Sequence, residues 1–167
     1  MYSLRKALLS DVDSMAHVHV TCWQETYTDL LDSSVINKFN MESRKKMWSL
    51  FLQKEIDSQR AYVAVYKDTV VGIASWMESP DQVEFLTLYV LSKFQHQGIG
   101  RDLFRQVEND ANEKKKSLIV WVLEGNSSIF FYKKMGLKLE TEELKKLGDV
   151  FVKEVMLSNR HPERIDK

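Results

Sequence analysis

The chain has 167 residues, and its 24 lysines and arginines balance its 24 aspartates and glutamates, so the formal net charge is zero. Hydrophobic residues make up 44% and charged residues 29%, a composition typical of one globular domain with a single core. This balance argues against a general nucleic-acid binder, and no apolar run reaches the roughly 18 residues of a membrane span. We therefore expect neither nucleic acid nor membrane among the partners.

Cys22 is the only cysteine, which excludes an internal disulfide and a secreted disulfide scaffold. A lone cysteine in an apolar helix is more often a small buried hydrophobe than a nucleophile. The chain also begins without the pattern of a signal peptide. A cytoplasmic protein is therefore expected.

The N-terminal residues predict a strand followed by a helix. Residues 2–7 alternate as a strand does, and Ser10 with the acids after it is placed to begin a helix as its N-cap. His17 and His19 in this helix are two positions apart, so they point to different faces and cannot share a metal ion. No metal site is expected.

A second helix and a hairpin come next. Residues 41–55 carry apolar side chains on one helical side, and residues 61–66 and 70–77 predict two antiparallel strands joined by a short turn. Gly72 inside the second strand indicates a bulge or a close approach of another element.

The central part of the chain predicts strand, turn, helix and strand. Residues 83–91 are rich in strand formers, and a helix runs from Gly98 to about residue 114. The charge run of residues 113–116 lies at its C-terminus and is expected to be solvated. The continuous apolar run of residues 117–123 is typical of an inner, parallel strand.

The last elements are a capped helix and two strands. Asn126 is placed to cap the helix and Gly136 to end it. The strands are expected over residues 137–142 and 150–157, with residues 145–149 in a loop. The order β-α-α-β-β-β-α-β-α-β-β follows, which periodicity alone assigns only to the α/β or α+β class. The domain is expected to span residues 1–160, with a flexible tail over 161–167.

The turn after the 83–91 strand carries an anion-binding pattern. The first N–H groups of a helix lack intrahelical partners, and the helix dipole attracts phosphate to that end. Gly98 and Gly100 would let an anion approach the backbone, and Arg101 adds a cation. The alternative is that the two glycines only form a tight turn. Neither a P-loop nor a complete G-x-G-x-x-G motif is present.

Two motifs together resemble one family. Gln95-His96-Gln97-Gly98-Ile99-Gly100 is similar to the Q/R-x-x-G-x-G/A signature of the GNAT superfamily of acyl-CoA N-acyltransferases, and the preceding Leu88-Tyr89-Val90 looks like that family's central strand. Downstream, the run from Asn126 through Phe131-Tyr132 to Gly136-Leu137 resembles its second hallmark, Asn followed by Phe-Tyr-x-x-x-Gly-Phe. Two motifs in the right order are more specific than either alone.

The resemblance covers nearly the whole chain and implies fold and activity. It implies a single-domain GNAT fold with a mixed, mostly antiparallel sheet of six or seven strands and helices on both faces. The implied activity is transfer of an acetyl group from acetyl-CoA to a primary amine, which is a small amine, a polyamine or a peptide N-terminus. The sequence is also distantly similar to the members of this family that acetylate polyamines. The alternative function is that of a non-catalytic acyl-CoA-binding regulatory module. In either case the protein is expected to be a monomer or a homodimer.

Two residues match the family's chemistry. By resemblance, Glu84 on the central strand is the base that takes the amine proton through water, and Tyr132 is the general acid that protonates the CoA sulfur. Glu25 is a rival base, and Glu84 at a solvated strand edge is the alternative reading. The alternative for Tyr132 is that its ring only packs in the aromatic cluster and takes no part in proton transfer.

The resemblance also implies the binding residues. A bulge at Leu88-Tyr89 would open a gap beside residues 118–123 for the pantetheine arm, with the Val90 N–H facing the thioester. The expected donor-binding residues are Leu88, Tyr89, Val90, Gln95, His96, Gln97, Gly98, Ile99, Gly100, Arg101, Asn126, Ser128 and Phe131. The expected acceptor-site residues are Trp23, Glu25 and Tyr27.

Overall fold

The computed structural model describes residues 1–54 and 59–160. The expected tail over residues 161–167 lies outside the described residues. None of the helices in the described ranges is long and apolar enough to cross a membrane.

A single sheet of seven strands organises the chain, in the order β1-β2-β3-β4-β5-β7-β6. Neighbouring strands are antiparallel except β4 and β5, which are parallel. The mixed, mostly antiparallel sheet is therefore confirmed. The strands are β1 Ser3–Lys6, β2 Gln59–Tyr66, β3 Thr69–Glu78, β4 Gln82–Val90, β5 Ser117–Leu123, β6 Lys138–Leu147 and β7 Val150–Ser158.

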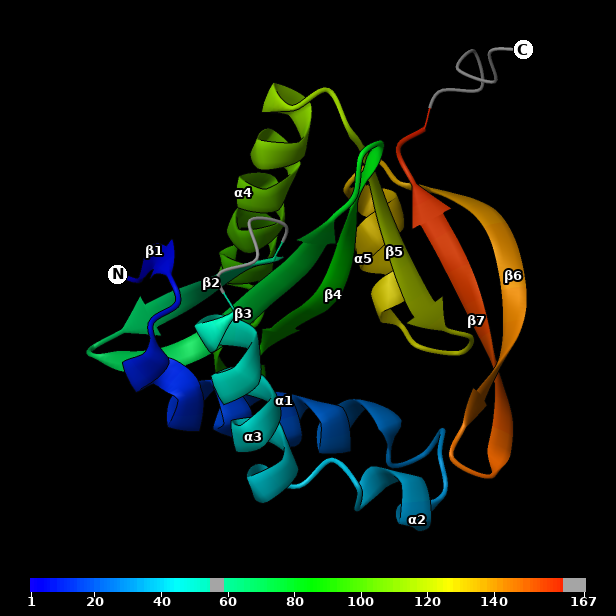
Figure 1. Ribbon diagram of the computed structural model, residues 1–167, viewed down its shortest axis with the longest axis horizontal. Coiled ribbons are helices and arrows are strands. Elements are labelled where there is room, and N and C mark those ends of the chain that lie inside the picture. Colours follow the sequence, from blue (N-terminus) through cyan, green and yellow to red (C-terminus); the bar gives the residue numbers. More distant parts are fainter. Residues whose placement is uncertain (55–58, 161–167) are drawn as a thin grey trace.

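Helices cover both faces of this sheet, as Figure 1 shows. Alternate residues of β2 and β3 enter two cores: Val63 and Ile73 pack against α1 and α3, whereas Ala64 and Ala74 belong to the core under α4. This alternation is the two-residue period of a strand buried on both faces. The α-helices are α1 Val12–Tyr27, α2 Ser33–Ile36, α3 Met41–Gln53, α4 Ile99–Glu113 and α5 Ser128–Lys134, and 3-10 turns span Leu9–Asp11 and Ser92–Phe94.

Three local expectations need correction. The short helix α2 was not predicted, because four residues carry too little periodicity. Ser10 does not cap α1, since it lies inside a 3-10 turn in which Asp11 accepts a hydrogen bond from the Leu8 N–H (2.8 Å) and pairs with Arg5 (2.7 Å). The expected loop over residues 145–149 shrinks to a two-residue turn, because Gly148 takes a left-handed conformation (φ 66°) and β6 continues to Leu147.

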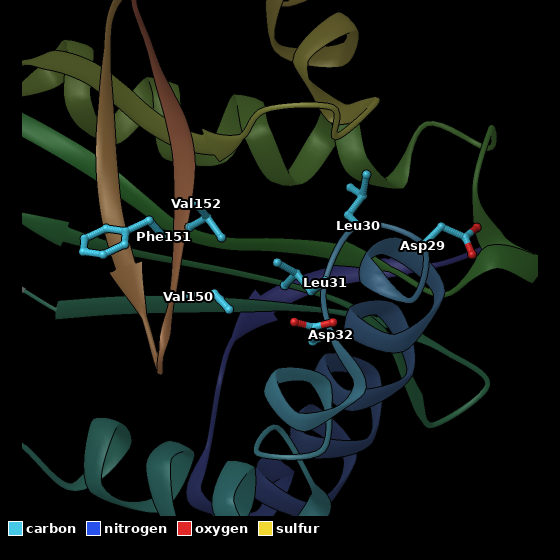
Figure 2. A pocket seen from close by; sticks show the side chains of 7 residues that line it. All are labelled: Asp29, Leu30, Leu31, Asp32, Val150, Phe151 and Val152. Carbon is cyan, nitrogen blue, oxygen red and sulfur yellow. The ribbon is translucent and has the colours of Figure 1, made fainter.

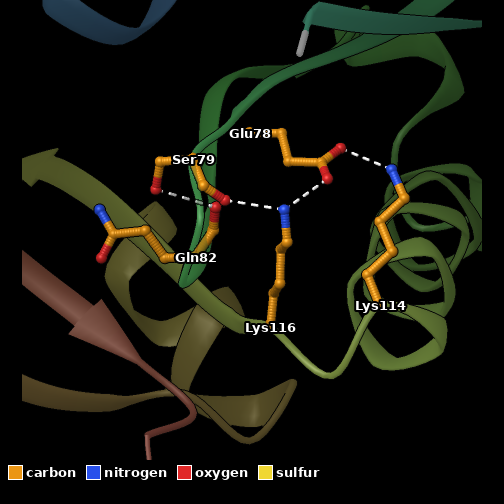
Figure 3. A network of polar contacts seen from close by, with 5 residues as sticks. All are labelled: Glu78, Ser79, Gln82, Lys114 and Lys116. Carbon is orange, nitrogen blue, oxygen red and sulfur yellow. Dashed lines mark hydrogen bonds and ion pairs between the residues drawn. The ribbon is translucent and has the colours of Figure 1, made fainter. Parts of the chain in front are cut away.

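The end of α4 is not a purely solvated charge run. Lys116 donates to Glu78 Oε1 (2.6 Å) and to the Ser79 carbonyl oxygen (2.8 Å), and Lys114 donates to Glu78 Oε2 (2.5 Å). These hydrogen bonds lower the pKa of Glu78, with the bond from Lys114 the largest cause. Figure 3 shows how this network joins the β3–β4 turn to the segment that enters β5. It holds the starts of the two parallel strands together.

The two parallel strands separate after four paired residues. β4 pairs with β5 only from Gln82 to Phe85, although β5 continues alongside β7 and β4 continues alongside β3 as far as Val90. The register between β3 and β4 skips Leu86, so the expected bulge exists but lies at Leu86 rather than at Leu88-Tyr89. The expected gap beside β5 is confirmed.

Candidate active site

A cleft of about 1240 Å³ opens where β4 and β5 diverge. Its wall combines the end of α1, the second half of β4, the turn before α4, and the start of α5. The expected site residues that line it are Glu25, Tyr27, Leu88, Tyr89, Val90, Gln95, His96, Gly98, Gly100, Arg101, Asn126, Ser128, Phe131 and Tyr132. The fold therefore brings together two motifs that lie about thirty residues apart in the sequence.

The glycine turn presents backbone donors to this cleft. Gly98 is left-handed (φ 90°) and precedes α4, and the Asp102 N–H donates to the Gly98 carbonyl oxygen (2.9 Å). The N–H groups of the three residues between them stand before the first helical hydrogen bond, so they are free to bind an anion. The Gln95 amide donates to the Val90 carbonyl oxygen (2.9 Å) and ties the turn to β4.

Two residues of the turn direct their side chains elsewhere. Gln97 donates to the Lys93 carbonyl oxygen (3.1 Å), and Ile99 is buried in the core under α4. Ile99 also explains the glycine in β3, because a Cβ at Gly72 would stand 3.2 Å from its Cγ2 atom. Binding by their backbone N–H groups stays a prediction.

Arg101 is held by residues that the motif did not reveal. It lines the cleft, and its Nε donates to Asp102 Oδ1 (3.0 Å), while the Tyr2 hydroxyl donates to Asp102 Oδ2 (2.6 Å). The Tyr2 bond is the largest cause of the lowered pKa of Asp102. No local sequence pattern links two residues that are 100 positions apart, so this support escaped prediction.

Helix α5 is fixed at both ends, although its N-cap is Ser127 and the expected Asn126 lies one residue before it. The Asn126 side-chain oxygen accepts from the Ser128 N–H (2.9 Å). At the other end Gly136 is left-handed (φ 100°), and the N–H groups of Gly136 and Leu137 donate to the carbonyl oxygens of Lys133 (3.0 Å) and Tyr132 (3.0 Å). This is the Schellman arrangement that ends a helix.

Tyr132 lines the cleft, and its phenol ring stands among other aromatic rings. Its ring centroid lies 5.3 Å from that of Phe131 and 6.3 Å from those of Phe85 and Phe104. Burial raises the pKa of Tyr132 above its ordinary value, and the neighbouring Tyr27 adds to the rise. Tyr132 is therefore a protonated hydroxyl at neutral pH.

Glu84 does not line the cleft described above. It is half-buried on β4, and its neighbours Val83 and Phe85 point into the core under α4, so Glu84 faces the opposite side of the sheet. Burial raises its pKa, Lys145 opposes that rise, and Glu154 adds to it. Its rival Glu25 is exposed, lines the cleft, and accepts from the Ser92 hydroxyl (3.2 Å). Cys22, for which no role was assigned, also lines the cleft.

Trp23 of α1 packs against Phe39 and Tyr27 rather than toward the cleft. Its ring stacks on Phe39 with centroids 3.8 Å apart and lies 4.2 Å from that of Tyr27. It is absent from the cleft lining within residues 1–54 and 59–160. Its contribution to an acceptor site would therefore be to support Tyr27.

A smaller pocket of about 330 Å³ adjoins the cleft between the α1–α2 connection and the start of β7. Asp29 and Leu30 line both cavities. Figure 2 shows Leu31 and Asp32 directed toward the hairpin, whereas the ring of Phe151 points away from the helices. The main cleft and the smaller pocket therefore meet at Asp29 and Leu30, just beyond the end of α1.

Comparisons with known proteins agree with this geometry. A sequence model of the acetyltransferase (GNAT) domain matches residues 57–138. The chain is 31% identical over 165 residues to an uncharacterized N-acetyltransferase, YuaI, of Bacillus subtilis strain 168, covering 94% of this chain and 92% of that protein.

Two solved structures show the same fold. The PaiA N-acetyltransferase of Thermoplasma acidophilum in complex with coenzyme A superposes with a TM-score of 0.77 at 23% identity, covering 92% of this chain and 98% of that one. The ribosomal-protein-S18-alanine N-acetyltransferase of Escherichia coli superposes with a TM-score of 0.70 at 14% identity, covering both chains completely (100%).

The buried His19, whose ring centroid lies 5.2 Å from that of Tyr89, predicts how the stability of the fold depends on pH. Burial lowers its pKa to about 3, so the folded chain keeps the imidazole neutral where an unfolded chain, with a pKa of about 6.5, binds a proton. Between pH 6.5 and pH 3 the unfolded state binds more protons than the folded state. The free energy of unfolding therefore falls on acidification by up to about 1.4 kcal/mol per pH unit. His19→Phe should flatten this slope in urea unfolding measured from pH 7 to 4.

The matched control is His17→Phe, which removes an exposed imidazole from the same helix. It should keep the slope of the unchanged protein. An equal slope in His19→Phe and the unchanged protein would show that His19 does not resist protonation.

Proposed function

The chain belongs to the GNAT family of acetyltransferases, and we propose that it transfers the acetyl group of acetyl-CoA to a primary amine by direct attack of the amine on the thioester. The acceptor is a small amine, a polyamine or a peptide N-terminus. The observation that carries the proposal is the single cleft that joins the glycine turn, the open side of β4 and Tyr132.

The cleft suits the shape and charge of acetyl-CoA. The N–H groups at the start of α4, with Arg101 beside them, would bind the pyrophosphate. The part of β4 beyond Leu86 has lost β5 as a neighbour, so the amide groups of the pantetheine arm would add to it as a strand does. The thioester then lies near Val90 and Tyr132, which both line the cleft.

The reaction needs two proton movements. As the amine nitrogen bonds to the acetyl carbon, the carbon–sulfur bond breaks and the nitrogen loses a proton. Tyr132 donates its hydroxyl proton to the departing sulfur, a role that its place in the cleft lining supports. Glu84 accepts the amine proton through water, since its side chain lies outside the cleft lining.

The environment of Glu84 supports a base with a proton affinity above that of an exposed glutamate. Its pKa is raised, chiefly because burial disfavours the carboxylate. A carboxylate held closer to neutral pH is a better proton acceptor for general-base catalysis. Glu25 remains the alternative base on the α1 side of the cleft.

Turnover tests the proposed reaction. Acetyl-CoA with a panel of a monoamine, spermidine and a short peptide with a free N-terminus should give amine-dependent thiol release. Tyr132→Phe should lower kcat by well over tenfold, roughly the range of general acid catalysis, with little change in KM for acetyl-CoA. Tyr66→Phe is the control, because this tyrosine on β2 is absent from the cleft lining in the described residues.

Two outcomes would contradict this account. Binding of acetyl-CoA without turnover on any amine would favour a regulatory acyl-CoA-binding module. Full activity of Tyr132→Phe would remove the general acid from the mechanism.

The pH dependence tests Glu84 separately. Because only the carboxylate accepts a proton, kcat/KM should rise with pH through the raised pKa of Glu84. Glu84→Gln should lower kcat by about a hundredfold or more and remove this rise. Glu113→Gln at the exposed end of α4 should behave as the unchanged protein. If Glu84→Gln keeps both rate and profile, the base is another group, with Glu25→Gln the next variant.

A further inference from the structure

Strand β6 forms one edge of the sheet. Within residues 1–54 and 59–160 its one neighbouring strand is β7, and Figure 1 shows β6 along the outer border of the sheet. Every residue of β6 from Lys138 to Lys146 is exposed. An edge strand presents backbone N–H and C=O groups with which another strand can pair.

The charges of β6 follow an order that is complementary to itself. Residues 142–146 read Glu-Glu-Leu-Lys-Lys. If a second copy of this run lies antiparallel and centred on Leu144, each glutamate faces a lysine of the copy: Glu142 faces Lys146, and Glu143 faces Lys145. Opposite charges that face each other across antiparallel strands stabilise the pair, and like charges destabilise it. A register centred on Glu142 would instead place this carboxylate opposite its own copy.

The backbone of β6 has the phase that this register needs. Leu147 and Val150 face each other across the two-residue turn of the hairpin. Residues in this position direct their N–H and C=O groups at each other, and the direction alternates along an antiparallel strand. Counted back from Leu147, Glu143 directs its groups to β7, whereas Leu144 and the residues two positions before and after it direct theirs to the open edge. Leu144 is therefore able to exchange two hydrogen bonds with its own copy.

The same register would cover exposed apolar side chains. Leu144 is 75% exposed and Phe151 is 71% exposed. Phe151 lies opposite Lys146, so its ring is on the same face of the hairpin as Leu144. Opposite residues of antiparallel strands share a face, so the two copies of Leu144 would meet on the symmetry axis, with a Phe151 ring one strand away on each side.

The ion pairs within the hairpin leave two of the four charges available. Glu142 pairs with Lys153 (2.8 Å), and Lys145 pairs with Glu154 (3.3 Å). In the described part of the chain, Glu143 and Lys146 have no ion-pair partner. Each pair between the copies would therefore join one of these two charges to a charge that already has a partner within its own chain.

We propose that the chain forms a homodimer in which the β6 strands of two copies pair antiparallel about a two-fold axis at Leu144. The two sheets then form one continuous sheet, and the interface is the same surface on both copies, as a two-fold axis requires. The start of β7 lines the smaller pocket beside the cleft, so the dimer would also hold this wall in place. The inference does not depend on the proposed reaction.

Sedimentation equilibrium with charge-reversed variants tests the interface. The unchanged chain at micromolar concentrations should have twice the mass of one 19.6 kDa chain. Lys145→Glu with Lys146→Glu makes one variant, and Glu142→Lys with Glu143→Lys makes a second. Each turns every attractive pair of the interface into a repulsive one and should raise the dimer Kd by roughly a hundredfold or more. An equimolar mixture of the two variants should regain the dimer mass.

A third variant tests the register. The chain that carries all four changes reads Lys-Lys-Leu-Glu-Glu and is again complementary to itself about Leu144, so it should form its own dimer. The matched control is Lys45→Glu with Lys46→Glu on α3, which changes the net charge equally and also breaks an ion pair, that of Lys45 with Asp13 (3.1 Å). This control should keep the dimer mass of the unchanged chain.

Three results would overturn the inference. One is a monomeric unchanged chain, which would show that the charges of β6 only keep other strands away from the edge. Another is a dimer that persists in both charge-reversed variants, because its interface would then lie elsewhere. The third is a four-change variant that stays monomeric. Acetyl transfer by a monomeric chain would leave the proposed function standing.

Discussion

The site depends on one break in the sheet. β4 and β5 are held together at their starts by four paired residues and by the hydrogen bonds of Lys116 to Glu78 and Ser79, and they separate beyond Phe85. A buried strand that loses its neighbour exposes N–H and C=O groups that need partners. The bulge at Leu86 and the cleft beside it follow from the same break, so the sheet itself provides the place for a strand-like ligand.

Both sides of this opening are rigid for different reasons. On the α4 side, the helix packs against Gly72 so closely that a side chain there would meet Ile99, and this contact sets the start of the helix beside β4. On the α1 side, the helix is packed through Trp23, Phe39 and the neutral His19. A hydrogen bond between Tyr27 and Asn126 crosses from one side to the other.

Features that short sequence segments encode were predictable. The glycine turn, the apolar β5 and both ends of α5 rest on contacts within a few residues, and the structure has each of them. Most of the candidate site residues that line the cleft were found because two short motifs carry them, whereas Glu25 and Tyr27 lie on α1 outside both motifs. Contacts between distant segments were not predictable: Tyr2 with Asp102, Tyr27 with Asn126, and the lysines that follow α4 with Glu78. The bulge was displaced by two residues because its position depends on pairing with β3. Glu84 lies outside the cleft lining for a related reason, since the alternation of β4 directs it to the other face.

Hydrogen exchange with and without acetyl-CoA tests the central claim, that the separated strand and the glycine turn bind one donor. Acetyl-CoA should slow the exchange of backbone amides both in β4 after Leu86 and in the first turn of α4. ADP, which lacks the pantetheine arm, should protect only the first turn of α4. Protection of the helix start by acetyl-CoA without any change in β4 would contradict the account, because the open strand would then not be the site of the pantetheine arm.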